Sequence, residues 1–264
     1  MKRPMFFFVL FFGAMLFIFS AQFNKKPQTG STQPNVRVVQ GSNHDRRYID
    51  QAALIPDWSA IATWPPGSTE EVDTVAEVDP WQVTTMIVLD DSGSMEGRID
   101  QAKSAITDAV AQFDARSRVG VMALNAGLVA EVVAAGDAAL LLPDQLKPIV
   151  AAGNTPLGSR LDDAARILEN EASERRGFGV FRILVTTDGA ASDADRLNRA
   201  VSQILSETPI ELATIGIGIG EGHALNVPGF TSYVSVNGVD GLANALAAAA
   251  AEQTNFQPID RFEE

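Results

Sequence analysis

The sequence predicts an α/β fold in which a mostly parallel sheet has one antiparallel edge strand and carries helices on both faces. From residue 82 to residue 253, short apolar runs alternate with segments of helical periodicity, the pattern of a parallel sheet with crossover helices. VTTMIVLD at 83–90 and VFRILVTTD at 180–188 have the nearly continuous apolar character of strands buried on both sides. Asn125-Ala126-Gly127 separates two further runs and indicates a hairpin, which supplies the antiparallel strand.

The same periodicity assigns the elements in chain order. We expect strands at 83–90, 118–125, 128–135, 180–188, 211–219 and 233–236. We expect helices at 98–114, 137–150, 157–173, 192–207 and 241–253, with kinks at Pro143 and Pro148 and with Ser192 as an N-cap. Together they form a doubly wound, Rossmann-like domain at 82–253, followed by a tail at 254–264.

The N-terminal residues lie outside this alternation. Residues 5–23 carry no charge and nearly span a ~30 Å hydrocarbon core at about 1.5 Å per residue. Ile18 and Phe19 stand where a signal peptidase site needs a small residue, so an uncleaved anchor at 1–23 is favoured over a cleaved signal. We expect an extracytoplasmic domain, secreted if the segment is cleaved. Residues 24–81 read as a polar stalk and linker, with a short helix or docked segment at 48–62.

Composition excludes several classes of site. The chain has no cysteine and two histidines, which rules out disulfides, zinc–thiolate sites, iron–sulfur clusters and multi-histidine metal sites. Four of the 20 Lys and Arg residues precede residue 27 and all 33 Asp and Glu residues follow it, so the remainder has a formal charge of −17. Such a body repels nucleic acid and attracts cations or basic partners; the charge also serves solubility.

Three loops with oxygen-bearing side chains follow from the predicted topology. Asp90-Asp91-Ser92-Gly93-Ser94 follows the first strand, Asn154-Thr155-Pro156 enters a helix, and Thr187-Asp188-Gly189 follows the strand at 180–188. Ligands of such sheets bind beyond the carboxyl ends of the strands, so we expect the three loops to meet there. Carboxylates and hydroxyls are hard donors that suit Mg²⁺, Mn²⁺ or Ca²⁺.

The combination resembles the von Willebrand factor type A (VWA) domain with its metal-ion-dependent adhesion site. D-x-S-x-S, then a threonine in G-N-T-P-L-G, then an aspartate in T-D-G occur in the order of that family, and the resemblance covers residues 82–253. It implies five metal-site residues: Asp90, Ser92, Ser94, Thr155 and Asp188. It also implies Mg²⁺, or Mn²⁺ or Ca²⁺, with an open coordination position for an Asp or Glu carboxylate of a partner protein.

Neighbouring residues have plainer interpretations. Asp91 has no place in the family pattern and is expected to be a loop carboxylate. Thr155 before Pro156 also has the form of a helix N-cap. Asp193 and Glu96 lie near the predicted rim with nothing specific to assign them a role, and His223 is expected in a surface loop.

Enzyme motifs are missing from the sequence. GIGIGEG at 216–222 does not fit G-x-G-x-x-G, and neither a P-loop nor a G-x-S-x-G elbow is present. A phosphohydrolase using D-x-D would need a second carboxylate where Ser92 stands. We therefore expect a membrane-tethered binding module and no enzyme. The alternatives are a regulatory subunit docking to an ATPase or chaperone machine, a metal-dependent hydrolase, and a scaffold whose metal site is idle.

Overall fold

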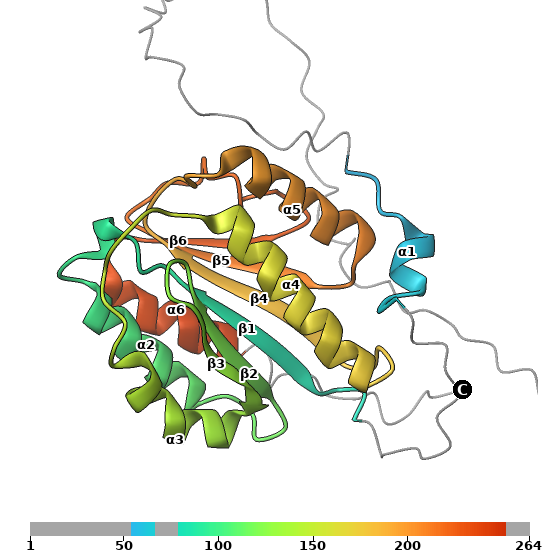
Figure 1. Cartoon of the computed structure of the whole chain (residues 1–264), viewed down its shortest axis with the longest axis horizontal. Helices are drawn as coiled ribbons and strands as arrows, with labels where there is room; N and C mark the ends of the chain where they lie inside the picture. Colours follow the sequence, from blue (N-terminus) through green and yellow to red (C-terminus); the bar gives the residue numbers. More distant parts are fainter. Residues whose placement is uncertain (1–53, 67–78, 252–264) are drawn as a thin grey trace, which may run out of the picture. The chain divides into compact units, whose positions relative to one another are not determined.

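A computed structural model of the chain describes residues 54–66 and 79–251 (Figure 1). The predicted anchor at 1–23, much of the predicted stalk and the tail at 254–264 lie outside these residues. None of the helices at 54–66 and 79–251 is both long enough and apolar enough to cross a membrane.

Six strands form one sheet in the order β3-β2-β1-β4-β5-β6 (Figure 1). All neighbouring strands are parallel except β2 and β3, which form the predicted antiparallel hairpin at one edge. The fold class is therefore confirmed. The strands are β1 (Val83–Leu89), β2 (Arg118–Ala123), β3 (Gly127–Ala134), β4 (Val180–Thr187), β5 (Glu211–Ile217) and β6 (Ser232–Val236).

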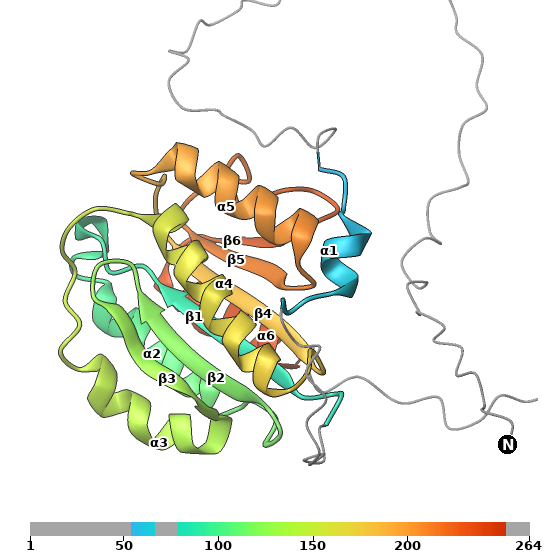
Figure 2. The same cartoon turned by 45° about the vertical axis from the view of Figure 1, so that its right-hand side comes forward.

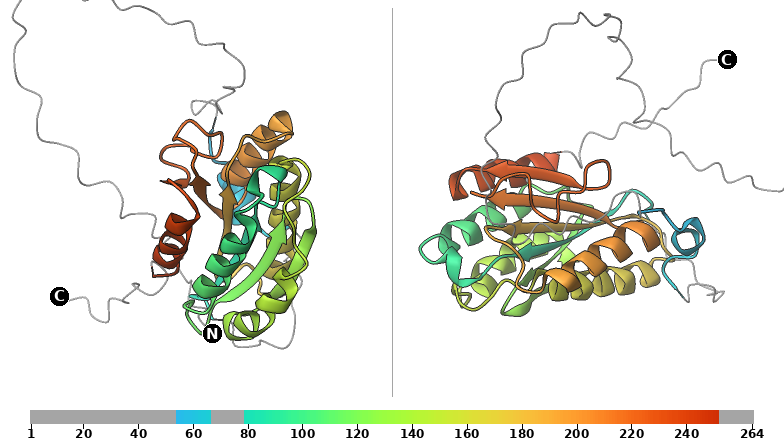
Figure 3. Two further views of the ribbon diagram at one scale, coloured as in Figure 1. Left: turned by 90° about the vertical axis from the view of Figure 1, so that its left-hand side faces the viewer. Right: turned by 90° about the horizontal axis from the view of Figure 1, so that it is seen from above.

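Helices cover both faces of the sheet. On one face, α2 contacts both α3 and α6; on the other, α4 and α5 lie side by side (Figures 2 and 3). The helices are α2 (Ile99–Val110), α3 (Ala135–Leu146), α4 (Leu157–Glu174), α5 (Ala194–Glu207) and α6 (Val239–Ala251). The alternating side chains of β1 show why its sequence is apolar throughout: Ile87 and Leu89 pack into the core under α2, and Met86 and Val88 into the core under α4 and α5.

Several predicted boundaries shift. The helix expected at 137–150 ends at Leu146, so Pro143 lies inside it and Pro148 lies beyond it, which leaves no helix at Pro148 to kink. A short 3-10 turn, η2 (Gly93–Met95), precedes α2, which is shorter than expected. Ser192 does not cap α5: Asp193 occupies that position, and no side-chain cap bond is made there.

A segment before the domain packs on its surface at the end of α5. In α1 (Trp58–Ala62), the Asp57 carboxylate caps the helix by accepting from Ser59 N at 2.9 Å, and Asp57 N donates to Ser206 O at 2.7 Å. Leu54 is buried in the core under α4 and α5, and Trp64 meets Phe181 edge-on, with ring centroids 5.1 Å apart. A short helix and docked segment are thus observed within residues 54–66.

The chain order places a topological switch point at the middle of the sheet, between β1 and β4. From β1 the chain proceeds to β2 and β3 on one side, and from β4 to β5 and β6 on the other. Adjacent strands whose connections run in opposite directions leave an opening at their carboxyl ends. The loops after β1 and β4 both begin at this point of the sheet.

Candidate functional site

Three loops meet at the carboxyl ends of β1 and β4. These strands pair in parallel with Leu89 opposite Thr186, so the residues that follow them emerge together. The loop before α4 joins them through two backbone bonds, from Ala152 N to Asp91 O at 2.8 Å and from Gly93 N to Gly153 O at 3.2 Å. The structure therefore assembles the three loops that the sequence singled out.

Asp90 is fully buried and held in one orientation. Its Oδ1 accepts from Ser92 N at 2.9 Å, while its Oδ2 accepts from the Thr187 hydroxyl at 2.8 Å and from Asp188 N at 3.3 Å. These donors are neutral, and a buried carboxylate usually has a cation or metal beside it. The T-D-G motif does not by itself indicate this role for Thr187, because the bond depends on the pairing of β1 and β4.

Ser92, Ser94 and Asp188 form a chain of oxygen atoms beside Asp90. The two serine Oγ atoms are 3.0 Å apart, and Ser94 Oγ donates to Asp188 Oδ1 at 2.6 Å. Because the Ser94 hydrogen points to the carboxylate, Ser92 is the donor between the two serines, which leaves one lone pair of Ser94 Oγ and both lone pairs of Ser92 Oγ available for a cation. Four of the five predicted ligands are thus connected by hydrogen bonds.

Thr155 lies half-buried in the loop before α4, and its side chain makes no hydrogen bond to another described residue. Its carbonyl accepts from Ser192 N at 2.8 Å. The prediction that Thr155 caps α4 is wrong. Instead, both carboxylate oxygens of Asp193 accept from the first turn of α4, from Gly158 N at 3.0 Å and Ser159 N at 2.8 Å. The Thr155 hydroxyl therefore remains free of capping.

Asp91, expected to be an ordinary loop carboxylate, fastens the β2–β3 turn. Its side chain is buried and accepts from Asn125 N at 2.7 Å, Asn125 Nδ2 at 3.0 Å and Ala126 N at 3.0 Å. Asn125 Nδ2 also donates to Asn154 O at 2.9 Å, in the residue before Thr155. Asp91 thus supports the loop that carries Thr155.

His223 lies in the loop after β5 and supports the loop that carries Asp188, through a bond to Gly189. Leu225 N donates to its Nδ1 at 3.2 Å, which leaves Nε2 to carry the hydrogen and to bond Gly189 O at 3.1 Å. The ring stacks on Tyr233, with centroids 6.4 Å apart. Burial lowers the pKa of His223, against the opposing influence of the Gly189 carbonyl and the Asp90 charge.

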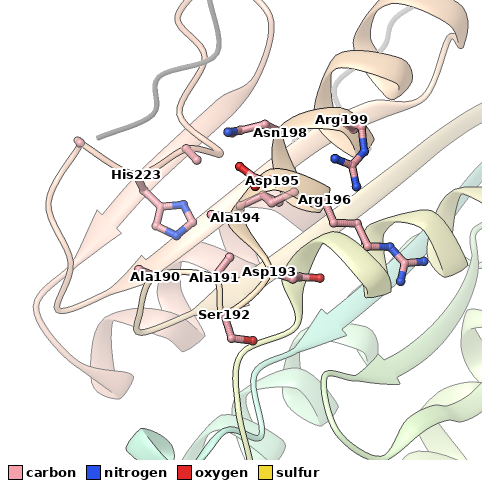
Figure 4. A pocket seen from close by; sticks show the side chains of 13 residues that line it. Ala190, Ala191, Ser192, Asp193, Ala194, Asp195, Arg196, Asn198, Arg199 and His223 are labelled. Carbon is pink, nitrogen blue, oxygen red and sulfur yellow. The ribbon is translucent and has the colours of Figure 1, made fainter. Parts of the chain in front are cut away.

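A cavity of about 510 Å³ adjoins the site (Figure 4). It begins at Ala190, two residues after Asp188. The loop containing His223 lies on one side of it, and the start of α5 with Asp195 and Asn198 on the other. The cavity has room for a ligand because several of the residues that line it are small: Ala190, Ala191, Ala194, Gly222 and Ala224.

The donor set fits a hard divalent cation. In the described part of the chain, no group of three or more His, Cys, Asp or Glu side chains could hold a metal. The candidate site instead offers two carboxylates and three hydroxyls. All are hard oxygen donors of the type that Mg²⁺, Mn²⁺ and Ca²⁺ prefer.

Residues 85–191 match the family described as von Willebrand factor type A domain. No curated protein matches the chain. Three solved structures share the fold: a von Willebrand factor type A protein from Catenulispora acidiphila (20% identity, TM-score 0.57), the pilus adhesin SpaC from Lactobacillus rhamnosus GG (14%, 0.55) and the vWF domain of the type V pili tip protein Mfa5 from Porphyromonas gingivalis (12%, 0.54).

The alignments cover 67%, 67% and 72% of this chain, respectively. They cover 43% of the Catenulispora chain and 30% of SpaC, so this chain spans less than half of either, but 99% of the Mfa5 domain.

Proposed function

From the match of residues 85–191 to the von Willebrand factor type A domain, we propose that the chain is a metal-dependent protein-binding module of this family. Two of the structures with this fold are described as a pilus adhesin and a pilus tip protein. Binding to another protein is the function that agrees best with the oxygen-donor site and with the fold that contains it.

The observation that carries the proposal is the connected set of oxygen donors at the carboxyl ends of β1 and β4. Ser94 Oγ lies between Ser92 Oγ and Asp188, and Asp90 is held beside them by neutral donors. We assign metal binding to Asp90, Ser92, Ser94, Thr155 and Asp188. The two carboxylates match the formal charge of a divalent ion, and the five donors leave one position of a six-coordinate ion such as Mg²⁺ open for a further oxygen ligand.

The chemistry of that anion points to a partner protein. A bound Mg²⁺, Mn²⁺ or Ca²⁺ supplies a Lewis-acidic position that prefers oxygen, and proteins offer it through Asp and Glu. The cavity beside Ala190 can receive residues that flank the partner's carboxylate. The charge of −17 beyond residue 26 disfavours nucleic acid as the partner.

We further propose that residues 5–23 anchor the chain in a membrane and hold the domain outside the cytoplasm. The support is the uncharged, apolar character of that stretch, with Lys2 and Arg3 before it and Lys25 and Lys26 after it. A cell surface or periplasm is where a tethered binding module meets its partner. Protease added to intact cells tests a cell-surface placement, and protease added after the outer membrane is opened tests a periplasmic one; digestion of the domain supports the proposal, and protection in both cases refutes it.

The test of binding is capture of a partner on the full chain, immobilised after detergent extraction. Wild type in Mg²⁺ should retain a partner that EDTA releases and that Asp90→Ala fails to capture. The matched control is Asp137→Ala, which removes an exposed carboxylate at the start of α3. A partner retained equally by Asp90→Ala, or in EDTA, would place binding on another face and refute the proposal.

A further inference from the structure

Arg98 places a guanidinium group directly on the proposed metal site. It lies just before α2, and its Nη2 donates to Ser94 O at 2.6 Å and to Asp188 Oδ2. Its side chain is 37% exposed, whereas that of Asp188 is 2% exposed. The arginine therefore reaches from the rim to a buried carboxylate that is one of the five assigned ligands.

This contact makes the two carboxylates of the site unequal. Asp188 has a hydrogen bond on each oxygen, from Ser94 Oγ on Oδ1 and from the cationic Arg98 on Oδ2. Asp90 receives hydrogen bonds from neutral donors, two backbone amides and the Thr187 hydroxyl. The charge of Asp188 is thus balanced within the chain before any metal binds.

We propose that Arg98 is a built-in counter-cation that competes electrostatically with the divalent metal for Asp188. The inference rests on the proposed function and deepens it by assigning a residue that sets metal affinity. A fixed positive charge beside a divalent ion opposes its binding, and a buried ion pair is screened less than a surface one. The guanidinium also stabilises the metal-free site, because Asp188 would otherwise be buried without a cation.

Partner binding follows from the same charge balance. With Arg98 already paired to Asp188, the proposed site with its metal has a surplus of positive charge. A partner's carboxylate reduces that surplus, so metal and partner strengthen each other's binding, and this coupling is reciprocal. Arg98 thereby favours loading of the site in the presence of a partner over tight metal binding in its absence.

A simpler role for Arg98 predicts the opposite change in metal affinity. If the arginine only held Ser94 and Asp188 in position for the metal, its removal would loosen the site and weaken metal binding. If it competes for Asp188, its removal strengthens metal binding. The direction of the change therefore separates the two roles.

The experiment is calorimetric titration of Mg²⁺ into the detergent-solubilised full chain of wild type, Arg98→Gln, Arg98→Lys and Arg182→Gln. Arg182 is the matched control because it donates to Glu211 Oε2 from Nε at 2.9 Å and from Nη2 at 2.7 Å. It lies at the other end of β4, about 20 Å from Asp188 at ~3.3 Å per residue. Both glutamine variants remove one positive charge and one ion pair.

Arg98→Gln should bind Mg²⁺ about tenfold more tightly than Arg182→Gln, because a nearby like charge has been removed. Arg98→Lys keeps the positive charge, so its Mg²⁺ affinity should stay within about twofold of wild type. The metal-free Arg98→Gln protein should melt at a lower temperature than Arg182→Gln and gain more from saturating Mg²⁺. If Arg98→Gln is too unstable to titrate, Mg²⁺ should restore its folded circular dichroism signal.

Three results would overturn the inference. The first is that wild type binds Mg²⁺ but Arg98→Gln binds it no more tightly than Arg182→Gln does. This result refutes competition and does not affect the proposed function. An unfolded Arg98→Gln that Mg²⁺ fails to restore would do the same. Failure of wild type and every variant to bind Mg²⁺ would refute the proposed metal site itself, and competition with it.

Discussion

Replacing Asp91 tests whether the site depends on a residue that is not among its assigned ligands. The carboxylate is buried and accepts three hydrogen bonds, from Asn125 N, Asn125 Nδ2 and Ala126 N, at 2.7, 3.0 and 3.0 Å. Asp91→Ala removes the acceptor and leaves these donors facing a void. Asp91→Asn keeps one acceptor oxygen but turns an amide N–H toward the same donors.

The magnitude follows from those three bonds. A hydrogen bond to a charged group contributes about 1.5–3 kcal/mol net, and bonds sharing one acceptor group are not additive. We expect Asp91→Ala to lower the free energy of unfolding by about 3 kcal/mol and Asp91→Asn by about half as much. At roughly 2–4 °C per kcal/mol for a domain of this size, the alanine variant should lose about 6–12 °C in melting temperature.

Urea titration of the full chain, followed by circular dichroism, measures these values. Asp137→Asn is the control for losing one negative charge, and its exposed position predicts a change within about 0.5 kcal/mol. Calorimetry should also show weaker Mg²⁺ binding by Asp91→Ala, because Asn125 then no longer steadies Asn154 beside Thr155. A loss below about 1 kcal/mol for Asp91→Ala would refute this account of the turn.

Three further changes test other contacts around the site. Because burial lowers the pKa of His223, the free energy of unfolding should fall as the pH drops below about 6.5, and it should fall less in His223→Asn. Urea titrations at about pH 7.5 and 5.5 compare wild type with the variant. Asp193→Ala should cost about 1–2 kcal/mol in the same titration, because the N–H groups of Gly158 and Ser159 lose their acceptor. Ala194→Leu should fill part of the cavity and weaken partner capture at least tenfold, with Mg²⁺ affinity unchanged in calorimetry.

The sequence predicts the positions of the three loops because backbone topology decides them. The runs at 83–90 and 180–188 are apolar enough to be central parallel strands, and the structure has β1 and β4 paired at the middle of the sheet. Parallel strands bring their carboxyl ends to one edge. Asp90 and Asp188 therefore meet even though 98 positions separate them in the chain.

Side-chain partners could not be predicted in the same way. Asp193 caps α4 across 35 positions, and Arg98 reaches Asp188 across 90. Local rules favour nearby residues, so they selected Thr155 as the cap of α4 and Ser192 as the cap of α5. The structure assigns neither role, because a carboxylate from another loop satisfies α4, and the N-cap position of α5 is Asp193, whose side chain makes no cap bond there. Contacts of this kind depend on how packed elements lie, which hydrophobic periodicity does not determine.

Charge at the site has a consequence for how the proposed module works. Asp90 is fixed by neutral donors, and Asp188 is paired with a cation from its own chain. Under the proposed function, Asp90 is then the main carboxylate left to balance a divalent ion, and the deficit makes a partner's carboxylate favourable. A site with two unpaired aspartates would bind metal more tightly and gain less from the partner. In the proposed module, the Arg98–Asp188 pair therefore lowers metal affinity and makes metal binding depend more on the partner.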